Sequence, residues 1–290
     1  MKVIERRFKY KYGQRFRFVI FSDLHLGSKL SAVKLFKENL INRYKDDEDA
    51  WFIDLGDCCD MIVSQTGDRR FEADMIDPSY VGLPNPVDRQ IDDYCELVWP
   101  IKDRLICLTD SNHHLGIERK TGTSPTRRIA WKLWEKESEN RMLGYAGFLV
   151  TRFSYDGSNK SGDAHHRTRT LVWSVCHGLG TGGKTEGGFK TTLGNDAINY
   201  DCDVACYAHN HQLDGWDRII LGVDQYANKV VSRKKTRINS GSYMKGFSDD
   251  TSTSYVEKRR MKPNALGHME FNVRIASAGV ETYYVKRMVL

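Results

Sequence analysis

The sequence predicts an α/β fold in which two mixed β-sheets pack as a sandwich and α-helices flank them. In the first half of the chain, apolar runs typical of strands alternate with amphipathic segments typical of helices. The second half is rich in strands. In addition, five polar segments each follow an apolar run, and strand ends are where open α/β sheets place their sites.

The expected elements follow from local patterns along the chain. Residues 17–22 are rich in β-branched and aromatic side chains, which favours a strand. Within 31–44, apolar residues recur at helical spacing, and Ser31 is a suitable N-cap. Ser124-Pro125 combines a cap with a proline at the first helical position, so a helix is expected over 124–137. The other expected elements are strands at 51–55, 104–109, 143–155, 169–176, 203–208, 236–240, 268–275 and 281–286, and a helix at 87–98.

The composition is that of a globular protein, with 290 residues, 40% of them hydrophobic and 28% charged. No apolar run approaches the roughly 20 residues of a membrane-spanning helix. Residues 1–17 lack the apolar centre of a secretory signal. We therefore expect a cytoplasmic protein without a membrane partner. It is expected to form a single domain, 1–290, with an inserted loop at about 62–86 and a strand-rich part at about 212–290.

Two further features of the sequence are its odd number of cysteines and the clustering of its basic residues. The seven cysteines are an odd number and are better explained as reduced thiols than as disulfides. Because no Cys-x-x-Cys pair exists, a zinc cluster held by thiolates is not expected at Cys58 and Cys59. The net charge is +6, and basic runs occur at 6–11, 233–237 and 258–262. Such runs favour binding to polyanions, although solvated surfaces and protected edge strands carry similar runs.

The five polar segments contain residue types that bind metal ions. They are Asp23-Leu24-His25, Gly56-Asp57-Cys58-Cys59-Asp60, Asn112-His113, His177-Gly178 and His209-Asn210-His211. Asp23 and His25 are two residues apart, so an extended backbone would place both side chains on one face. Imidazole, carboxylate and amide oxygen together suit Mn, Fe, Co, Zn or Ni. Of the nine histidines, five lie in these segments. His165, His166 and His268 are expected to be surface or structural residues.

With these motifs the chain resembles the calcineurin-like metallophosphoesterases. That family is recognised by Asp-x-His, Gly-Asp-x-x-Asp, Gly-Asn-His-Asp/Glu, a histidine after a strand, and Gly-His-x-His. The matching segments span residues 23 to 211, and Asn239-Ser240-Gly241-Ser242 is similar to the family's next strand-end turn. Two motifs depart from the pattern, with Ser111 and Ala208 in place of glycine and His114 in place of an acid. Since an acid at position 114 would hold His113, His114 is expected to weaken that support.

The resemblance implies a four-layer metallophosphoesterase-like fold and a centre with two divalent metal ions. One ion would be held by Asp23, His25, Asp57 and His211, and the other by Asp57, Asn112, His177 and His209. Mn²⁺ is the cation expected first, with Fe, Zn, Co and Ni as alternatives. Asp60 and His114 would support the centre. A hydroxide that bridges the two metal ions would attack phosphorus, and His113 would protonate the leaving group.

A competing motif follows His177. The segment Gly178–Thr185 matches the phosphate-binding P-loop pattern after an expected strand. Glycines at 187 and 188 would weaken the helix that this motif needs. We therefore do not expect a P-loop nucleotide hydrolase. Lys184 and the loop amides are expected either to contact a substrate phosphate or to form a flexible glycine loop.

The expected function is hydrolysis of phosphate esters. The basic runs favour a phosphodiesterase that acts on nucleic acid, that is, a DNA nuclease. Alternatives are a phosphodiesterase for small substrates, a phosphomonoesterase, and a metal-binding module without turnover.

Overall fold

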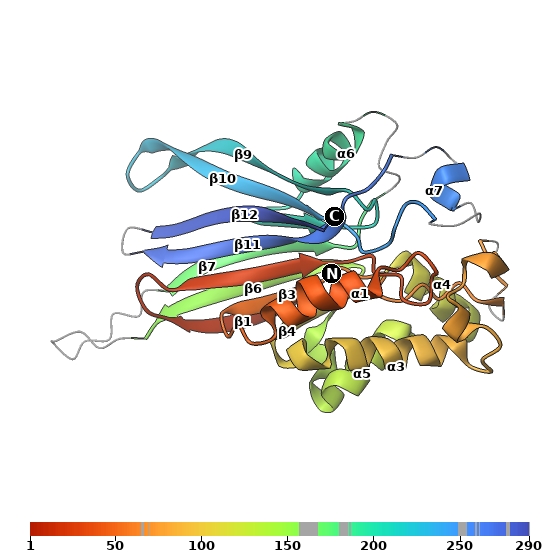
Figure 1. The fold of residues 1–290 in the computed structure, drawn as a ribbon. Helices are drawn as coiled ribbons and strands as arrows, with labels where there is room; N and C mark the ends of the chain where they lie inside the picture. The colour runs from red at the N-terminus through yellow and green to blue at the C-terminus, as the bar shows by residue number, and fades with distance from the viewer. Residues whose placement is uncertain are drawn as a thin grey trace.

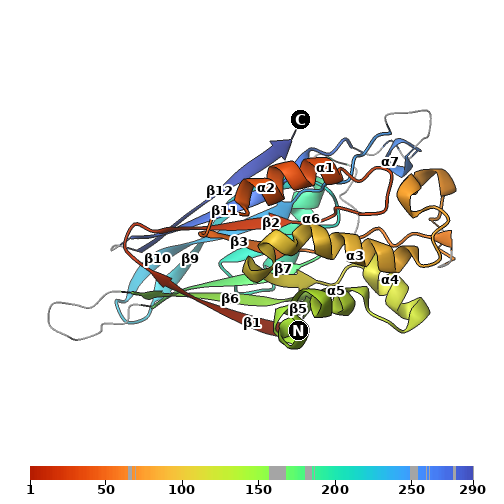
Figure 2. The ribbon, with the colours of Figure 1, turned by 60° about the horizontal axis from the view of Figure 1, so that its bottom comes forward.

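The computed structural model describes residues 1–64, 67–68, 70–156, 168–179, 185, 187–248, 254–258, 260, 262–276 and 279–289. Its strands, labelled in Figure 1, form two six-stranded sheets. Helices lie on the outer faces of the sheets, as Figures 1 and 2 show. The predicted fold class, two mixed sheets flanked by helices, is therefore confirmed.

The first sheet has the strand order β12-β11-β2-β3-β4-β5. Neighbouring strands from β2 to β5 are parallel, whereas β11 pairs antiparallel with both β2 and β12. The parallel strands β3 and β4 are buried along nearly their whole length, which explains their continuous apolar runs. The bounds are β2 (Arg15–Phe21), β3 (Ala50–Asp54), β4 (Leu105–Thr109), β5 (Met142–Gly144), β11 (Leu266–Ala276) and β12 (Gly279–Val289).

The second sheet has the strand order β1-β6-β7-β8-β10-β9. Here β7, β8 and β10 are parallel to one another, and β9 and β10 form an antiparallel hairpin. The bounds are β1 (Lys2–Tyr10), β6 (Ala146–Tyr155), β7 (Thr168–Cys176), β8 (Val204–Tyr207), β9 (Leu213–Asp224) and β10 (Lys229–Ser240). Strands β1 and β9 were not predicted. In β1 the inward face includes Arg6, which interrupts the apolar alternation, and in β9 half of the residues are exposed and none is fully buried.

Helices cover the outer face of each sheet. On the first sheet, Phe36, Tyr94 and Ile129 from three helical segments pack against Phe21 and Phe52 of β2 and β3. On the second sheet, α6 packs over Tyr207. The α-helices are α1 (Val33–Phe36), α2 (Asn42–Tyr44), α3 (Pro86–Val98), α4 (Asn112–Thr121), α5 (Pro125–Trp134), α6 (Gly188–Ala197) and α7 (Tyr255–Lys258). A π-helix at Lys37–Ile41 joins α1 to α2, and 3₁₀ turns lie at Ala73–Met75, Pro78–Tyr80, Trp99–Arg104 and Glu135–Arg141. Helices α4 and α6 were not predicted.

The space between the sheets is filled by aromatic side chains. Phe18 lies 4.9 Å from Trp173 between ring centroids, and Trp173 lies 5.0 Å from Phe271. The Trp173 indole N–H donates to Thr151 Oγ1 at 3.0 Å, so its polar group is paired inside the core. This core fixes the two sheets relative to each other, and with them the loops that carry the polar segments.

Two further sequence-based expectations can be compared with the fold. All seven cysteines are buried and free, in agreement with reduced thiols. No helix in the described part of the chain is long and apolar enough to cross a membrane.

Candidate metal centre

The loops after β2 and β3 are held together by backbone hydrogen bonds. The Asp23 N–H donates to the Gly56 carbonyl at 3.0 Å, and the His25 N–H donates to the Asp57 carbonyl at 2.9 Å. The parallel pairing of the two strands thus continues beyond their ends. As a result, Asp23, His25 and Asp57 lie side by side at the edge of the first sheet.

Five predicted ligands share an unusual backbone conformation. Asp23, His25, Asp57, His209 and His211 have φ angles of 49°, 50°, 50°, 70° and 58°. Residues other than glycine rarely adopt positive φ, and each such position costs roughly 1–3 kcal/mol. Conformations of this cost are concentrated at functional sites, because the surrounding fold must impose them. The backbone here turns these five side chains toward a common point.

The first group of ligand atoms comes from Asp23, His25 and His211. Asp23 Oδ1 lies 3.7 Å from His25 Nε2 and 3.3 Å from His211 Nε2. One ligand atom from each residue lies within 4.8 Å of the other two. Asp57 Oδ2 lies 3.8 Å from His25 Nε2, on the side of the second group. The four residues expected around one cation are therefore brought together.

The second group comes from Asp57, His177 and His209. Asp57 Oδ2 lies 3.2 Å from His177 Nε2, and Asn112 Oδ1 lies 2.9 Å from the same nitrogen. The His177 and His209 rings are 5.2 Å apart between centroids. His177 Nδ1 lies 2.6 Å from the Leu55 carbonyl, to which it donates its proton, so Nε2 is left to face the other ligands. This is the set expected around the other cation.

Two buried ligand atoms lack a hydrogen bond in the described part of the chain. They are Asp23 Oδ1 and His25 Nε2. A buried polar atom without a partner costs about 1–3 kcal/mol. A cation at this position would satisfy both atoms, and the mixture of imidazole and carboxylate suits a borderline transition metal. The residues present therefore fit a metal ion, and we conclude that this cluster can bind metal.

The charges of the cluster are strongly coupled. Burial opposes ionisation of Asp23 and Asp57, but neighbouring imidazoles, His211 beside Asp23 and His177 beside Asp57, hold the pKa of both carboxyls well below its usual range. Burial likewise opposes protonation of His25, but the neighbouring carboxylates, led by Asp23, raise its pKa to about 10. Buried carboxylates and imidazoles so close together are suited to a cation, which would take the place of the imidazole protons.

His113 occupies the first turn of α4, next to Asn112. Its backbone N–H donates to Asp57 Oδ1 at 3.3 Å, and its Nδ1 lies 2.5 Å from the Asp60 carbonyl. Arg70 Nη1 lies 2.9 Å from His113 Nε2. Because a guanidinium only donates, His113 accepts at Nε2 and donates its proton from Nδ1. The imidazole is neutral in this arrangement, and burial lowers its pKa.

Arg70 is a residue of the site that the sequence reasoning did not identify. It belongs to the inserted loop expected at about 62–86, in which no site residue was predicted. Asp68 holds the guanidinium with two contacts, Oδ1 to Nε at 3.1 Å and Oδ2 to Nη2 at 2.9 Å. The carboxylate of Asp68 raises the pKa of Arg70, which is therefore charged. The only sequence signal was an Asp-x-Arg pattern that follows the Gly-Asp-x-x-Asp motif closely.

Asp54 is a second residue that was missed. This buried carboxylate ends β3, where it accepts from the Gly56 N–H at 2.8 Å and from the Tyr94 hydroxyl at 2.5 Å. Burial raises the pKa of Asp54 to about 6. The side chain does not reach the ligand cluster. Its contribution is to shape the turn that presents Asp57.

The expected supporting residues Asp60 and His114 behave differently. Asp60 Oδ1 lies 3.1 Å from His25 Nδ1, so Asp60 contacts both His25 and His113. His114 points elsewhere, with Nδ1 2.9 Å from Thr126 Oγ1 and Nε2 3.7 Å from Cys58 Sγ. The expectation that His114 supports the centre is therefore not met, whereas its expected failure to hold His113 agrees with these contacts. Successive helical residues are rotated by about 100°, so 113 and 114 face different directions on α4.

Some expectations concern residues outside the described ranges. Lys184 and the glycine loop at 180–184 are among them, so the expected phosphate contact stays a prediction. His165 and His166 also lie outside the described residues. In the part of the chain that is described, α6 begins only at Gly188.

The basic runs lie in different places relative to the ligand cluster. Lys9 of the first run pairs with Ser154, which pairs with Thr168. Thr168 precedes His177 by nine residues, or about 30 Å at the rise of a strand. The second run lies in the middle of β10, where Arg237 pairs with Ala205, four residues before His209. In the third run, Lys258 pairs at 2.7 Å with Glu72 of the loop that carries Arg70. This third run, of which Arg259 and Met261 lie outside the described residues, is therefore on the side of the cluster.

No family model matches the chain, and neither does any curated protein. Among solved structures, the chain is similar to vacuolar protein sorting 29 of Cryptosporidium parvum, with 10% identity and a TM-score of 0.38 over 96% of this chain and 100% of that one. It is similar to a Streptococcus pneumoniae protein described as a predicted phosphoesterase, with 12% identity and a TM-score of 0.33 over 94% and 90% of the two chains. A third similar structure is vacuolar protein sorting 29 of Entamoeba histolytica in complex with Zn²⁺, with 9% identity and a TM-score of 0.34 over 93% and 99%.

These similarities say nothing about the site. The fold is established by the two sheets themselves, and the site by the residues gathered at their edge. Both agree with the resemblance to calcineurin-like metallophosphoesterases that the motifs carry.

Proposed function

We propose that this protein is a metal-dependent phosphoester hydrolase with a centre for two divalent cations. The observation that supports this most directly is the position of Asp57 between the two groups of ligands. Its Oδ2 lies 3.8 Å from His25 Nε2 and 3.2 Å from His177 Nε2. A carboxylate shared in this way is suited to bridge two metal ions, and two-metal centres are common in phosphoester hydrolysis.

In this proposal the ligands divide as the resemblance implied. Asp23, His25 and His211 hold one cation, Asn112, His177 and His209 hold the other, and Asp57 contacts both. Mn²⁺ is the cation proposed first, and Fe, Zn, Co and Ni are the alternatives. The bound pair would supply Lewis acidity and a hydroxide nucleophile at neutral pH.

Two residues of this chain would then act on the substrate. Arg70 carries the charge and the paired N–H groups that suit a phosphate oxygen. When Arg70 turns to the phosphate, His113 Nε2 is released from its present hydrogen bond. The approach of a phosphate anion favours the protonated imidazole, and His113 would then pass the Nε2 proton to the leaving oxygen.

The test is turnover of bis(p-nitrophenyl) phosphate. Protein stripped of metal by a chelator is expected to be inactive and to regain activity with Mn²⁺. Asp57→Asn and His113→Ala are each expected to lower kcat/KM by at least about 100-fold, the scale of losing a metal bridge or a general acid. Asp103→Asn is the control, because the Asp103 side chain is 86% exposed and distant from the cluster. Equal activity in all four proteins would refute the proposal.

We propose nucleic acid, and DNA in particular, as the substrate to test first. The third basic run and Arg70 support it, whereas Lys9 of the first run lies at the far end of the second sheet. DNA cleavage is expected to fall steeply with salt, since phosphate contacts release counterions. Turnover of small diesters without salt dependence would favour a phosphodiesterase for small substrates, and such turnover of monoesters would favour a phosphomonoesterase. Bound metal without any turnover would favour a binding module.

We also propose that the protein works in the cytoplasm. The support is the set of seven buried free cysteines, which is typical of a reducing compartment. Cell fractionation of a tagged chain tests this, and recovery from an oxidising compartment would contradict it.

A further inference from the structure

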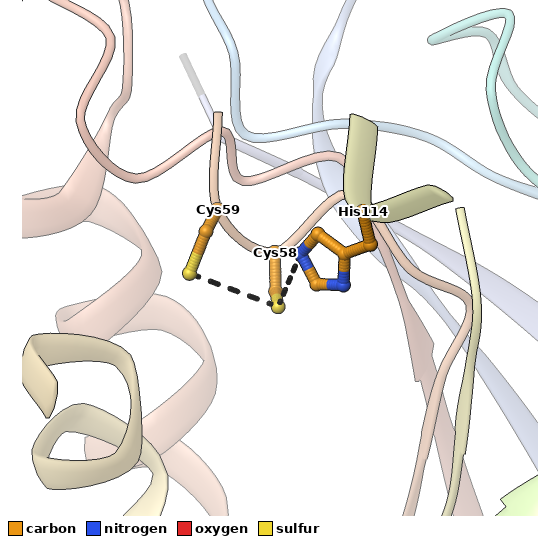
Figure 3. A group of neighbouring side chains, drawn as sticks. All are labelled: Cys58, Cys59 and His114. Atoms are coloured by element: carbon orange, nitrogen blue, oxygen red, sulfur yellow. Dashed lines mark hydrogen bonds between the residues drawn. The ribbon is translucent and has the colours of Figure 1, made fainter. Parts of the chain in front are cut away.

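A second cluster of metal-binding side chains lies between the loop that follows β3 and helix α4. Figure 3 shows its three members, Cys58, Cys59 and His114. Cys58 Sγ lies 4.0 Å from Cys59 Sγ and 3.7 Å from His114 Nε2. The three ligand atoms lie within 4.8 Å of one another, and all three residues are buried. None of them is a ligand of the centre proposed above.

We propose that Cys58, Cys59 and His114 form a separate site for one thiophilic cation, with Zn²⁺ as the first candidate. The expectation that these cysteines do not bind zinc rested on the absence of a Cys-x-x-Cys spacing. That spacing is unnecessary here, because the third ligand comes from α4 rather than from the same loop.

The distances agree with coordination of a single ion. Thiolates bind zinc at about 2.3 Å and imidazoles at about 2.0–2.1 Å, so ligands at the tetrahedral angle are about 3.8 Å apart for two sulfurs and about 3.6 Å for sulfur and nitrogen. The observed separations at Cys58 are 4.0 Å and 3.7 Å. The ligand atoms of the remaining pair, Cys59 and His114, lie within 4.8 Å of each other.

His114 is oriented as a metal-binding histidine usually is. Its Nδ1 lies 2.9 Å from Thr126 Oγ1 at the start of α5, while Nε2 faces the Cys58 sulfur. A hydrogen bond at one ring nitrogen fixes the tautomer and aims the other nitrogen at the metal. The departure from the family motif at position 114 therefore has a local partner in Cys58.

The charges also balance. One divalent cation, two thiolates and a neutral imidazole have no net charge, which suits surroundings that include the apolar Ile91 and Ile117. Binding would displace the two thiol protons, one of which now faces the Gln90 carbonyl, 3.4 Å from Cys59 Sγ. The ion would tie the loop that carries Asp57 to helix α4, and so would hold the two parts of the phosphoesterase centre together.

The experiment uses Zn²⁺ and Co²⁺ as probes on the full chain. X-ray absorption of the zinc-loaded protein is expected to show sulfur neighbours, and Co²⁺ is expected to give an intense near-ultraviolet band from sulfur to cobalt. The proposed phosphoesterase centre contains no thiolate, so neither signal can come from it. The Cys58→Ala/Cys59→Ala variant should lose both signals and one equivalent of zinc, whereas Cys206→Ala, at a buried cysteine elsewhere, should keep them.

Zinc without sulfur neighbours in the wild-type protein would overturn the proposal, whether or not the double variant folds. An equal zinc content in the wild type and the double variant would overturn it too. Neither readout depends on turnover, so the result is independent of whether the protein hydrolyses phosphate esters.

Discussion

Arg70 shows how a single side chain can link an inserted loop to the metal centre. Asp68 fixes its guanidinium, and His113 accepts its free N–H at 2.9 Å. A charged group in this position would meet an incoming phosphate before the metals do. The contact with His113 also couples substrate binding to release of the proposed acid.

The Arg70→Ala variant is expected to lower kcat/KM for bis(p-nitrophenyl) phosphate by roughly 10–100-fold, because one charge-assisted hydrogen bond contributes about 1.5–3 kcal/mol. Arg70→Lys should recover part of the loss. Arg89→Ala serves as the control, since Arg89 forms a solvent-exposed ion pair with Asp93 on α3. Steady-state kinetics of the three variants would detect the difference, and unchanged kinetics in Arg70→Ala would exclude a phosphate contact.

At the scale of single residues, the sequence predicted which residues could bind metal. It did not predict which other side chains contact the residues of the site. Asp23, His25 and His211 carry their chemistry in sequence motifs. The contact between His113 and Arg70 depends instead on how a long insertion folds back over the site. Likewise, the direction of His114 depends on where α4 begins, and this helix was not recognised from its sequence.

At the scale of elements, the turn between β3 and the ligand Asp57 depends on one glycine. Gly56 has φ +94°, and an added Cβ would lie 2.9 Å from Ser111 Cβ and 3.1 Å from His177 Nδ1. This position therefore excludes side chains both by conformation and by space. It also brings the β3 loop against the start of α4 and against a proposed ligand.

The Gly56→Ala substitution is expected to destabilise the fold by at least about 1–2 kcal/mol from the left-handed conformation alone, and the close contacts add to this. It should also weaken metal binding, because His177 must move. Gly116→Ala on α4 is the matched control, since no atom lies within 4 Å of its added Cβ and alanine favours a helix. Thermal unfolding and metal titration of both variants provide the measurement. Equal stability of the two would contradict the account of this turn.

His268 joins β11 to the helical layer. Its Nδ1 accepts from the Tyr243 hydroxyl at 2.7 Å, and its Nε2 lies 3.2 Å from the Tyr44 hydroxyl. Burial lowers its pKa to about 3. The expectation that His268 is a structural residue agrees with these contacts.

Because the folded state keeps His268 neutral, its contribution to stability is complete above pH 6.5 and is lost as the pH falls toward 3. At pH 5 the loss amounts to about 2 kcal/mol relative to pH 7. In His268→Gln, the difference in unfolding free energy between pH 7 and pH 5 should be smaller by about this amount. Urea denaturation at the two pH values tests this. An identical pH dependence in both proteins would mean that His268 is not buried as a neutral base.

At the scale of the whole molecule, the two ends of the sheets carry different residues. The strand ends of both sheets gather the ligand residues on one side, while Lys9 of the first basic run and Lys229 at the start of β10 lie toward the other. The two sheets and their flanking helices could be predicted from the alternation of strands and helices. The place of the basic runs could not, because it depends on strand direction and register. That the chain forms a single domain stays a prediction.

Charge reversal can distinguish the surfaces at these two ends. Lys262→Glu, in the third run, is expected to reduce DNA cleavage and its salt dependence while turnover of bis(p-nitrophenyl) phosphate is unchanged. Lys229→Glu, at the exposed start of β10, should change neither activity. Loss of DNA cleavage in Lys229→Glu alone would show that the substrate follows the far surface instead.

The central claim is that Asp57 is shared by two cations. Crystals of the Mn²⁺-loaded protein, measured at a wavelength where manganese scatters anomalously, test it most directly. The account predicts two anomalous peaks about 3.5–4 Å apart, with the Asp57 carboxylate between them. A single peak, or two peaks of which neither contacts Asp57, would contradict it.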